Sequence, residues 1–295
     1  MSKILRYSIL FMLTSVCLTT GLLSGCAGAG TPASTEKEKT IRIPYVQWAC
    51  AEAESHIAQV ILEDMGYNVE LSTVQAAVMW SSVATGDSDV FTTAWLPYTH
   101  ASYWEEYGND VERLGTIYDE AVLAIVVPDY VTINSIAEMK DHESEFQGRI
   151  VGIDPGAGIM EATRNVTMPT YGMEDWTLVE SSESGMLSEL ERAMSNEEWV
   201  AVTGWAPHWK FFAYDLKMLE DPEETLGGME EIVVIARKGF TEDFPEAAEF
   251  FKNWKINSAQ LGEVMYMINI DKLSPSDAAR SWIEANPDVV DSWIQ

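Results

Sequence analysis

Basic residues are scarce in this chain of 295 residues: 18 Lys and Arg stand against 47 Asp and Glu, for a formal net charge of −29. The shortage argues against a nucleic-acid partner, because phosphate binding needs a basic surface. It also argues against a protein that lies flat on anionic lipid. Simple solubility explains the charge equally well, so the charge excludes partners without identifying one.

Histidine and cysteine are also scarce, and the motifs of common catalytic sites are missing. The four histidines are scattered, and the sequence contains no Gly-x-Ser-x-Gly elbow, no His-Glu-x-x-His and no recognisable Cys–His motif. Imidazoles and thiols are common metal ligands, and so few of them argue against a metal site. Carboxylates are too abundant for any pair of them to be informative. We therefore predict a protein that is not an enzyme and that needs no metal and no cofactor.

An apolar run at residues 9–23 follows the basic residues Lys3 and Arg6. It ends in Leu-Ser-Gly directly before Cys26. This order resembles a bacterial lipoprotein signal, so we predict a signal peptide at 1–25 and lipid attachment at Cys26. A plain secretory signal is the alternative, and the run is too short to favour a transmembrane anchor.

Residues 26–39 are rich in Gly, Ala, Ser and Thr and then charged, which is typical of a tether. Loss of the signal would remove its two basic residues and move the formal charge from −29 to −31. Cys17 would leave with the signal and Cys26 would carry lipid. Only Cys50 would then remain, so we expect no disulfide within one mature chain.

Strand-like and helix-like runs alternate beyond the tether, which predicts an α/β architecture. Strands are expected at 40–46, 69–73, 89–93, 121–127, 149–153, 176–180, 199–203 and 231–236. Helices are expected at 52–65, 76–85, 135–140, from 161 onwards, and at 185–194, 242–254, 259–268 and 275–285. This alternation favours mainly parallel sheets, whose ligand crevices lie beyond the carboxyl ends of the strands. The roughly 255 residues after the tether exceed a typical domain and suggest two lobes.

Three tryptophans stand where apolar runs give way to polar or turn residues. They are Trp48, Trp95 and Trp205. Indole faces carry the negative side of the ring quadrupole, so three such rings can line a pocket for a cation with an apolar surface. The pattern therefore predicts capture of a quaternary ammonium compound.

A glycine-rich turn at 152–160 leads from an expected strand into an expected helix. The first amides of a helix have no backbone acceptor and can receive an anion. A nucleotide site is disfavoured, because no Gly-Lys-Ser/Thr and no complete Gly-x-Gly-x-x-Gly is present. An ordinary strand-to-helix turn is the alternative. His100, five residues after Trp95, is a candidate donor to the same anion, and a small carboxylate fits best.

Four segments together resemble the substrate-binding lipoproteins of glycine betaine ABC transporters. They are Tyr-Val-Gln-Trp at 45–48, Ala-Trp-Leu-Pro-Tyr-Thr-His at 94–100, the turn at 152–160, and Val-Thr-Gly-Trp-Ala-Pro-His-Trp at 202–209. The resemblance covers essentially all of the chain after the signal. It implies an α/β, two-lobed periplasmic-binding-protein-like fold with a ligand cleft between the lobes.

The resemblance also implies a role for each site residue. Trp48, Trp95 and Trp205 match the family's cage around the trimethylammonium group, the amides of Gly158 and Ile159 match its carboxylate donors, and His100 matches the assisting side chain. One lobe is expected at 40–127 plus 237–295 and the other at 128–236. His208 and Trp209 lie near Trp205 without an assigned role.

The implied function is that of a lipid-anchored receptor on the extracytoplasmic face of the cell membrane, which delivers glycine betaine or a relative to an ABC permease for osmoprotection. Proline betaine is the nearest alternative ligand, choline lacks the carboxylate, and carnitine is longer. A sensory ligand-binding domain is a second alternative, disfavoured because no transmembrane segment follows Gln295. A secreted hydrolase is a third, but it would need a nucleophile that the sequence does not offer.

Overall fold

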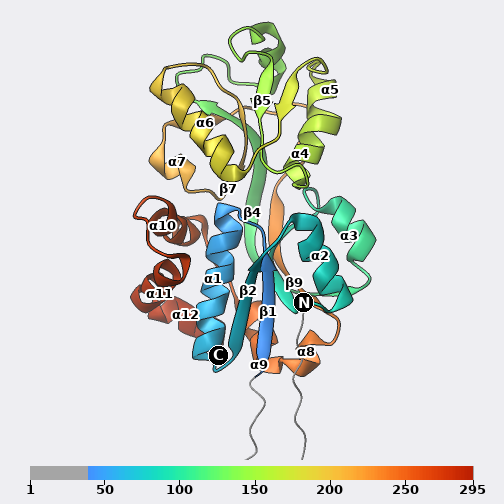
Figure 1. The fold of residues 1–295 in the computed structure, drawn as a ribbon, viewed down its shortest axis with the longest axis vertical. Helices are drawn as coiled ribbons and strands as arrows, with labels where there is room; N and C mark the ends of the chain where they lie inside the picture. The colour runs from blue at the N-terminus through green and yellow to red at the C-terminus, as the bar shows by residue number, and fades with distance from the viewer. Residues whose placement is uncertain (1–38, 295) are drawn as a thin grey trace, which may run out of the picture. The chain divides into compact units, whose positions relative to one another are not determined.

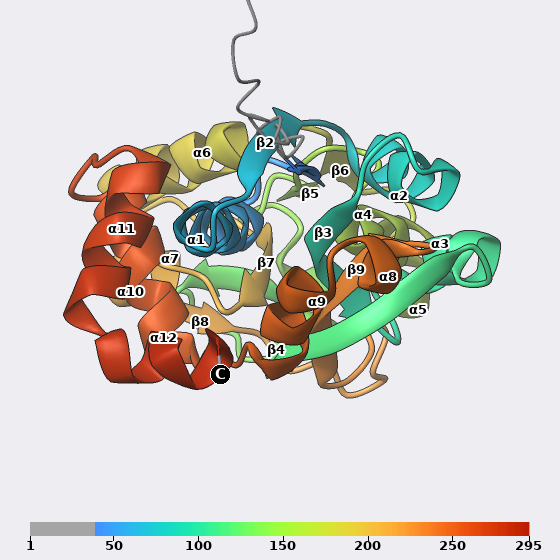
Figure 2. The same ribbon diagram turned by 90° about the horizontal axis from the view of Figure 1, so that it is seen from below.

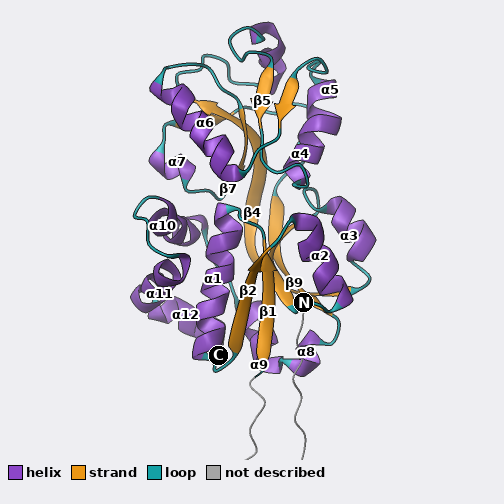
Figure 3. Ribbon diagram, in the orientation of Figure 1, coloured by secondary structure: helices purple, strands orange, loops and turns teal. Residues whose placement is uncertain are grey.

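The computed structural model describes residues 39–294, and these form a mixed α/β fold (Figure 3). The predicted signal peptide, the lipid-attachment residue Cys26 and almost all of the tether lie outside the described residues. Within 39–294, no helix combines the length and the apolar character that crossing a membrane requires.

A seven-stranded sheet runs through the fold, beside a separate parallel pair of strands. The strand order of the larger sheet is β3 (Val90–Leu96), β9 (Glu230–Arg237), β4 (Val111–Pro128), β7 (Val202–Ala206), β5 (Arg149–Val151) and β6 (Thr177–Val179), with β8 (Leu216–Met218) paired to β4. The parallel pair is β1 (Thr40–Tyr45) and β2 (Asn68–Thr73).

Strand β4 is the element that both halves of the fold share (Figure 1). Its first part, Val111–Ala121, pairs with β9, and its last part, Val122–Pro128, pairs with β7 and β8. We call the elements around the first part the β1 half and those around the second part the β5 half.

The β1 half carries most of the helices. They are α1 (Ala49–Asp64), α2 (Ala76–Thr85), α3 (Ala101–Tyr107), α8 (Phe240–Asp243), α9 (Pro245–Asn253), α10 (Ser258–Asn269), α11 (Pro275–Ala285) and α12 (Pro287–Ile294). Viewed from below, α10, α11 and α12 lie on one side of α1, and α2 and α3 lie on the other side of the fold (Figure 2). Helix α1 therefore runs through the middle of this half, with its N-terminus towards the β5 half (Figure 1).

The β5 half surrounds its short parallel strands with helices. They are the 3₁₀ helix η1 (Ile136–His142), α4 (Gly158–Ala162), the π-helical turn η2 (Thr163–Thr167), α5 (Met168–Thr170), α6 (Glu183–Ser195) and α7 (Lys210–Ala213). The Ser135 side chain caps η1 together with Glu138, and the Ser182 side chain caps α6.

Seven tryptophans of residues 39–294 are packing residues of the hydrophobic cores. Trp80, Trp254 and Trp282 are fully buried or nearly so, and Trp80 packs edge-on against Phe91. The other four are likewise buried or partly buried in one of the two hydrophobic cores: Trp104, Trp176, Trp199 and Trp293.

The mixed α/β class and the two-lobed fold were predicted correctly, but the expectation of mainly parallel sheets was wrong. Strand β4 pairs antiparallel with β7, β8 and β9, and β3 pairs antiparallel with β9. The alternation of strands and helices misled the prediction, because β4 runs antiparallel to its neighbours β7, β8 and β9 although helices separate these strands in the sequence. Among the named strands of residues 39–294, parallel pairing is confined to β1–β2, β5–β6 and β5–β7.

The limits of the two lobes, at 127/128 and 236/237, stay a prediction. Strand β9 begins at Glu230, within the range predicted for the second lobe, and its hydrogen bonds go to β3 and β4. Strands β4 and β9 thus both pass through the region where the halves join.

Candidate functional site

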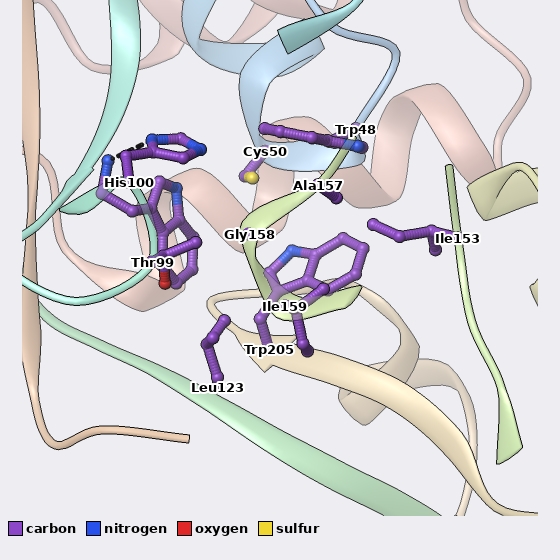
Figure 4. Close-up of a pocket in the computed structure, with 11 residues that line it drawn as sticks. Trp48, Cys50, Thr99, His100, Leu123, Ile153, Ala157, Gly158, Ile159 and Trp205 are labelled. Atoms are coloured by element: carbon purple, nitrogen blue, oxygen red, sulfur yellow. Dashed lines mark hydrogen bonds between the residues drawn. The ribbon is translucent and has the colours of Figure 1, made fainter. Parts of the chain in front are cut away.

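A small cavity lies where the β1 half meets the β5 half (Figure 4). The space in it that no protein atom fills, its open mouth included, is about 310 Å³. Its lining residues come from both halves: Trp48, Cys50, Trp95, Thr99, His100, Leu123, Ile153, Ala157, Gly158, Ile159 and Trp205. All six residues that the sequence singled out for ligand binding are in this set.

The three tryptophans reach the cavity from three different elements. Trp48 is the N-cap residue of α1, whereas Trp95 lies within β3 and Trp205 within β7. All three rings are buried, with 3–7% of their surface exposed. The Nε1 of Trp48 donates to Oδ2 of Asp154 at 3.0 Å, and this bond joins the two halves. The cavity is thus walled by indole rings whose positions are set by backbone elements rather than by mobile loops.

His100 is held with one ring nitrogen free. Its Nδ1 accepts a hydrogen bond from the backbone N–H of Trp95 at 3.0 Å. Burial lowers the pKa of His100 to about 3, so the ring is neutral near pH 7 and its single proton belongs on Nε2. That Nε2 is buried and bonds no atom of the described residues. His100 therefore offers an unused N–H donor at the edge of the cavity (Figure 4).

Two backbone amides offer further donors. Gly158 and Ile159 are the first residues of α4, after the N-cap Ala157, and both are buried. Within residues 39–294, no acceptor bonds their N–H groups, whereas the Met160 amide bonds the Ala157 carbonyl. First-turn amides are left free in this way by helix geometry, and a small anion can accept from them.

Only glycine fits at position 158. A Cβ built on Gly158 would lie 1.9 Å from the carbonyl oxygen of Thr99, which belongs to the other half. The loop before α4 can approach the loop after β3 this closely because residue 158 has no side chain.

No charged side chain lines the cavity. The pKa of the Cys50 thiol is raised well above its usual value, first by burial and then by Glu54 and Glu183, so the thiol stays protonated. Within residues 39–294, no group of His, Cys, Asp and Glu is arranged to hold a metal ion. For a cation the cavity supplies aromatic faces, and for an anion it supplies N–H donors.

Several residues that shape the site were missed by sequence reasoning. Five further lining residues had no assigned role: Cys50, Thr99, Leu123, Ile153 and Ala157. Glu230, at the start of β9, accepts from the backbone N–H groups of Tyr98 and Thr99 at 2.8 Å and so fixes the loop before His100. Nothing in the local sequence around Glu230 sets it apart from the many other acidic residues.

The three other histidines and Trp209 do not line the cavity. His208 is buried and bonds Glu183, and Trp209 is buried beside it without lining the cavity. His56 bonds Gln59, and His142 pairs with Glu145, away from the cavity. His208, to which the sequence assigned no role, thus bonds Glu183 behind the cavity.

The chain matches one protein family over most of its length. Residues 39–285 match the model of the substrate binding domain of the ABC-type glycine betaine transport system. A glycine betaine/carnitine transport binding protein of Listeria monocytogenes is 42% identical over 156 residues, which are 52% of this chain. The match spans 51% of the Listeria protein, about half of its length.

Solved structures give the same fold. The crystal structure of lactococcal OpuAC in its closed-liganded conformation with glycine betaine has a TM-score of 0.83 and 35% identity, covering 87% of this chain and 100% of that one. A choline binding protein of an ABC transporter in complex with choline has a TM-score of 0.80 and 26% identity, covering 86% and 91%. The two-lobed α/β fold is therefore that of a substrate-binding protein.

The close approach at Gly158 predicts a steric block. In Gly158→Ala, the new methyl group should collide with the Thr99 carbonyl and hold the two halves apart, which a crystal structure would reveal as a longer distance between residues 99 and 158. Gly156→Ala is the matched control, because a Cβ there meets nothing closer than 3.8 Å. An alanine variant at 158 with an unchanged separation of these loops would contradict the argument.

Proposed function

Because the chain belongs to the family of substrate-binding domains of ABC-type glycine betaine transport systems, we propose that it captures glycine betaine or a close relative and delivers it to an ABC permease. The observation that carries the proposal is the cavity lined by three indole rings and by the unused N–H groups of His100, Gly158 and Ile159, with no charged side chain of residues 39–294 among its walls. We infer that the ligand is a small molecule with a methylated ammonium at one end and a carboxylate at the other.

The methylated ammonium is assigned to the cage of Trp48, Trp95 and Trp205. A quaternary nitrogen has no N–H group, so a carboxylate partner gains no hydrogen bond from it. Aromatic faces attract the cation and shed water at little polar cost, worth roughly 0.5–2 kcal/mol per ring according to desolvation. Three rings together contribute several kcal/mol, which must exceed the cost of ordering the two halves.

The carboxylate is assigned to the amides of Gly158 and Ile159 and to Nε2 of His100. Fixed backbone donors bind an anion without loss of side-chain entropy, and hydrogen bonds to a charged acceptor are the stronger kind. His100 is neutral here, because a proton on Nδ1 would remove the acceptor of the Trp95 N–H, and its single proton stays on the free Nε2 across the physiological pH range. Choline lacks the group that these donors would hold.

The two ends of the ligand are served by both halves of the fold. Trp48, Trp95 and His100 belong to the β1 half, and Trp205, Gly158 and Ile159 belong to the β5 half. Only a closed arrangement completes the site, so ligand would shift the population from open to closed forms. The closed form is the state that a permease would have to recognise, for osmoprotectant uptake in this proposal.

The cage assignment predicts a large loss of affinity in Trp95→Ala. Removing one of three rings should weaken glycine betaine binding by about tenfold or more, measured by titration calorimetry. Trp199→Ala is the control, because Trp199 packs against Phe146 and His142 away from the cavity. A folded Trp95→Ala protein that binds as tightly as wild type would remove the cage from the proposal.

The donor assignment predicts ligand-specific effects in His100→Ala. This variant should lose much more affinity for glycine betaine than for choline, because only the former carries the carboxylate. Proline betaine should behave like glycine betaine, and carnitine tests the length that the cavity accepts. Equal losses for choline and glycine betaine, in parallel calorimetric titrations, would leave His100 without a role at the carboxylate.

We also propose that Cys26 carries a lipid that holds the receptor on the extracytoplasmic face of the cell membrane. Cys26 lies outside the described residues, so the proposal rests on the residues that precede it. Cys26→Ala should move the protein from the membrane to the soluble fraction in a fractionation experiment. A variant that stays with the membrane would mean that something other than this thiol anchors it.

A further inference from the structure

Behind the cavity, the carboxylate of Glu183 joins the two halves of the fold. Glu183 is the first residue of α6 in the β5 half, and its side chain is buried. Its Oε2 accepts from the backbone N–H of Ala49 at 3.0 Å, and its Oε1 lies 3.0 Å from Nε2 of His208. Ala49 is the first residue of α1 and directly follows Trp48, one of the three rings of the cavity.

Helix α1 has no cap of its own. The side chain of its N-cap residue, Trp48, makes no capping hydrogen bond. Free amides and the positive end of the helix dipole favour a negative charge at this position. Glu183, 134 residues away along the chain, supplies that charge from the other half.

The hydrogen bonds around His208 determine which form of Glu183 fits. Nδ1 of His208 accepts from the backbone N–H of Lys210 at 3.0 Å, so a neutral ring carries its proton on Nε2. Burial keeps the pKa of His208 well below its usual value, which favours this neutral form. Both oxygens of Glu183 then face N–H donors, and an ionised carboxylate satisfies both.

Lys210 carries the charge opposite to that of Glu183 and lies against the indole ring of Trp205. It is fully buried, and its Nζ lies 4.7 Å from the ring centroid of Trp205. Burial raises the pKa of Glu183 to about 7 and lowers that of Lys210 to about 7, although the attraction between the two groups opposes both shifts. Lys210 is not among the residues that line the cavity. Its ammonium therefore holds the indole of Trp205 from behind.

We propose that Glu183 is a positioning residue that sets the rings of Trp48 and Trp205 against each other when the two halves close. It caps the helix that begins beside Trp48 and, through His208 and the neighbouring Lys210, it is tied to the strand end that carries Trp205. The inference rests on the proposed function, because it concerns the same cavity. In this proposal, the hydrogen bond from the Ala49 N–H to Glu183 forms when the halves close and must break before ligand leaves.

The hydrogen bond between Trp48 and Asp154 also holds Trp48, in addition to the bond from Ala49 to Glu183. Asp154 accepts from the indole nitrogen of Trp48 at 3.0 Å, so Trp48 is held from the β5 half at its ring and at the amide that follows it. The two bonds restrict both the translation and the tilt of this ring relative to Trp205.

Glu183→Gln tests the inference with almost no change of shape. The amide of Gln keeps one acceptor for Ala49, but its NH₂ group then faces the N–H of His208. We expect the dissociation constant for glycine betaine to rise by about tenfold or more, with most of the change in the dissociation rate, as is usual when one partner of a buried charged bond is altered. Stopped-flow tryptophan fluorescence measures both rates.

A matched control removes the same charge elsewhere in the same half. Glu174 is exposed in the loop before β6, so Glu174→Gln should leave both rates unchanged. A readout that general destabilisation would not move is the Ala49 amide signal in ligand-saturated protein labelled with ¹⁵N-alanine. This signal should shift in Glu183→Gln and stay in place in Glu174→Gln.

The outcomes separate the inference from the proposed function. If wild type binds neither glycine betaine nor any other betaine, the proposed function fails and the inference fails with it. If wild type binds but Glu183→Gln releases ligand at the wild-type rate, the inference alone is overturned. Should Glu183→Gln not fold, Glu183→Asp keeps the charge on a side chain one methylene shorter, and the same faster release is expected from it.

Discussion

The approach of Gly158 to the carbonyl oxygen of Thr99 is the constraint on which the rest of the site depends. Any side chain at 158 would keep the two loops apart, since a Cβ there would lie 1.9 Å from that oxygen. With glycine in place, the amides of Gly158 and Ile159 come to the same cavity as His100 and the three indole rings. One backbone contact thus brings both kinds of binding group within the length of one small molecule.

The placement of charge follows from the same geometry. The chain carries a formal net charge of −29, yet no charged side chain lines the cavity. Buried charged groups lie one layer behind it, with Glu230 bonded to the loop that carries His100 and Glu183 bonded to the start of α1. Glu230 accepts from the N–H groups of Tyr98 and Thr99, and Glu183 accepts from the Ala49 N–H and bonds His208, so these two carboxylates orient the walls without taking up the donors proposed for the ligand.

The residues that line the cavity could be predicted from the sequence, but the residues that hold them in place could not. Large aromatics next to strand ends and glycines before a helix are uncommon enough to be noticed, and all six predicted residues line the same cavity. Their role in binding a ligand stays a prediction. Glu183 and Glu230 could not be singled out, because 47 acidic residues make any one of them unremarkable and only the fold brings them to their partners.

The fold could also be predicted only in part. Helix periodicity and end signals located α2 and α11 at their observed limits, and Gly86 ends α2 with a positive φ, as glycine often does after a helix. The strand expected at 199–203 lies instead at 202–206, and α12 was not expected. Short strands are placed by their pairing partners, and β7 is positioned by β4, whose course through both halves no local pattern indicates.

The polar bonds between the halves also bear on how a receptor of this kind avoids closing without ligand. A hydrogen bond to a carboxylate formed on closure replaces bonds to water and contributes a net of about 1.5–3 kcal/mol before the cost of burying the charge is counted. The bonds from Trp48 to Asp154 and from Ala49 to Glu183 are therefore too weak to hold the halves together alone, since closure also buries the carboxylate of Glu183 at a cost. Three rings around a cation contribute more than either bond. Ligand thus supplies the larger share of the closing free energy, and the polar bonds determine the geometry in which the halves meet.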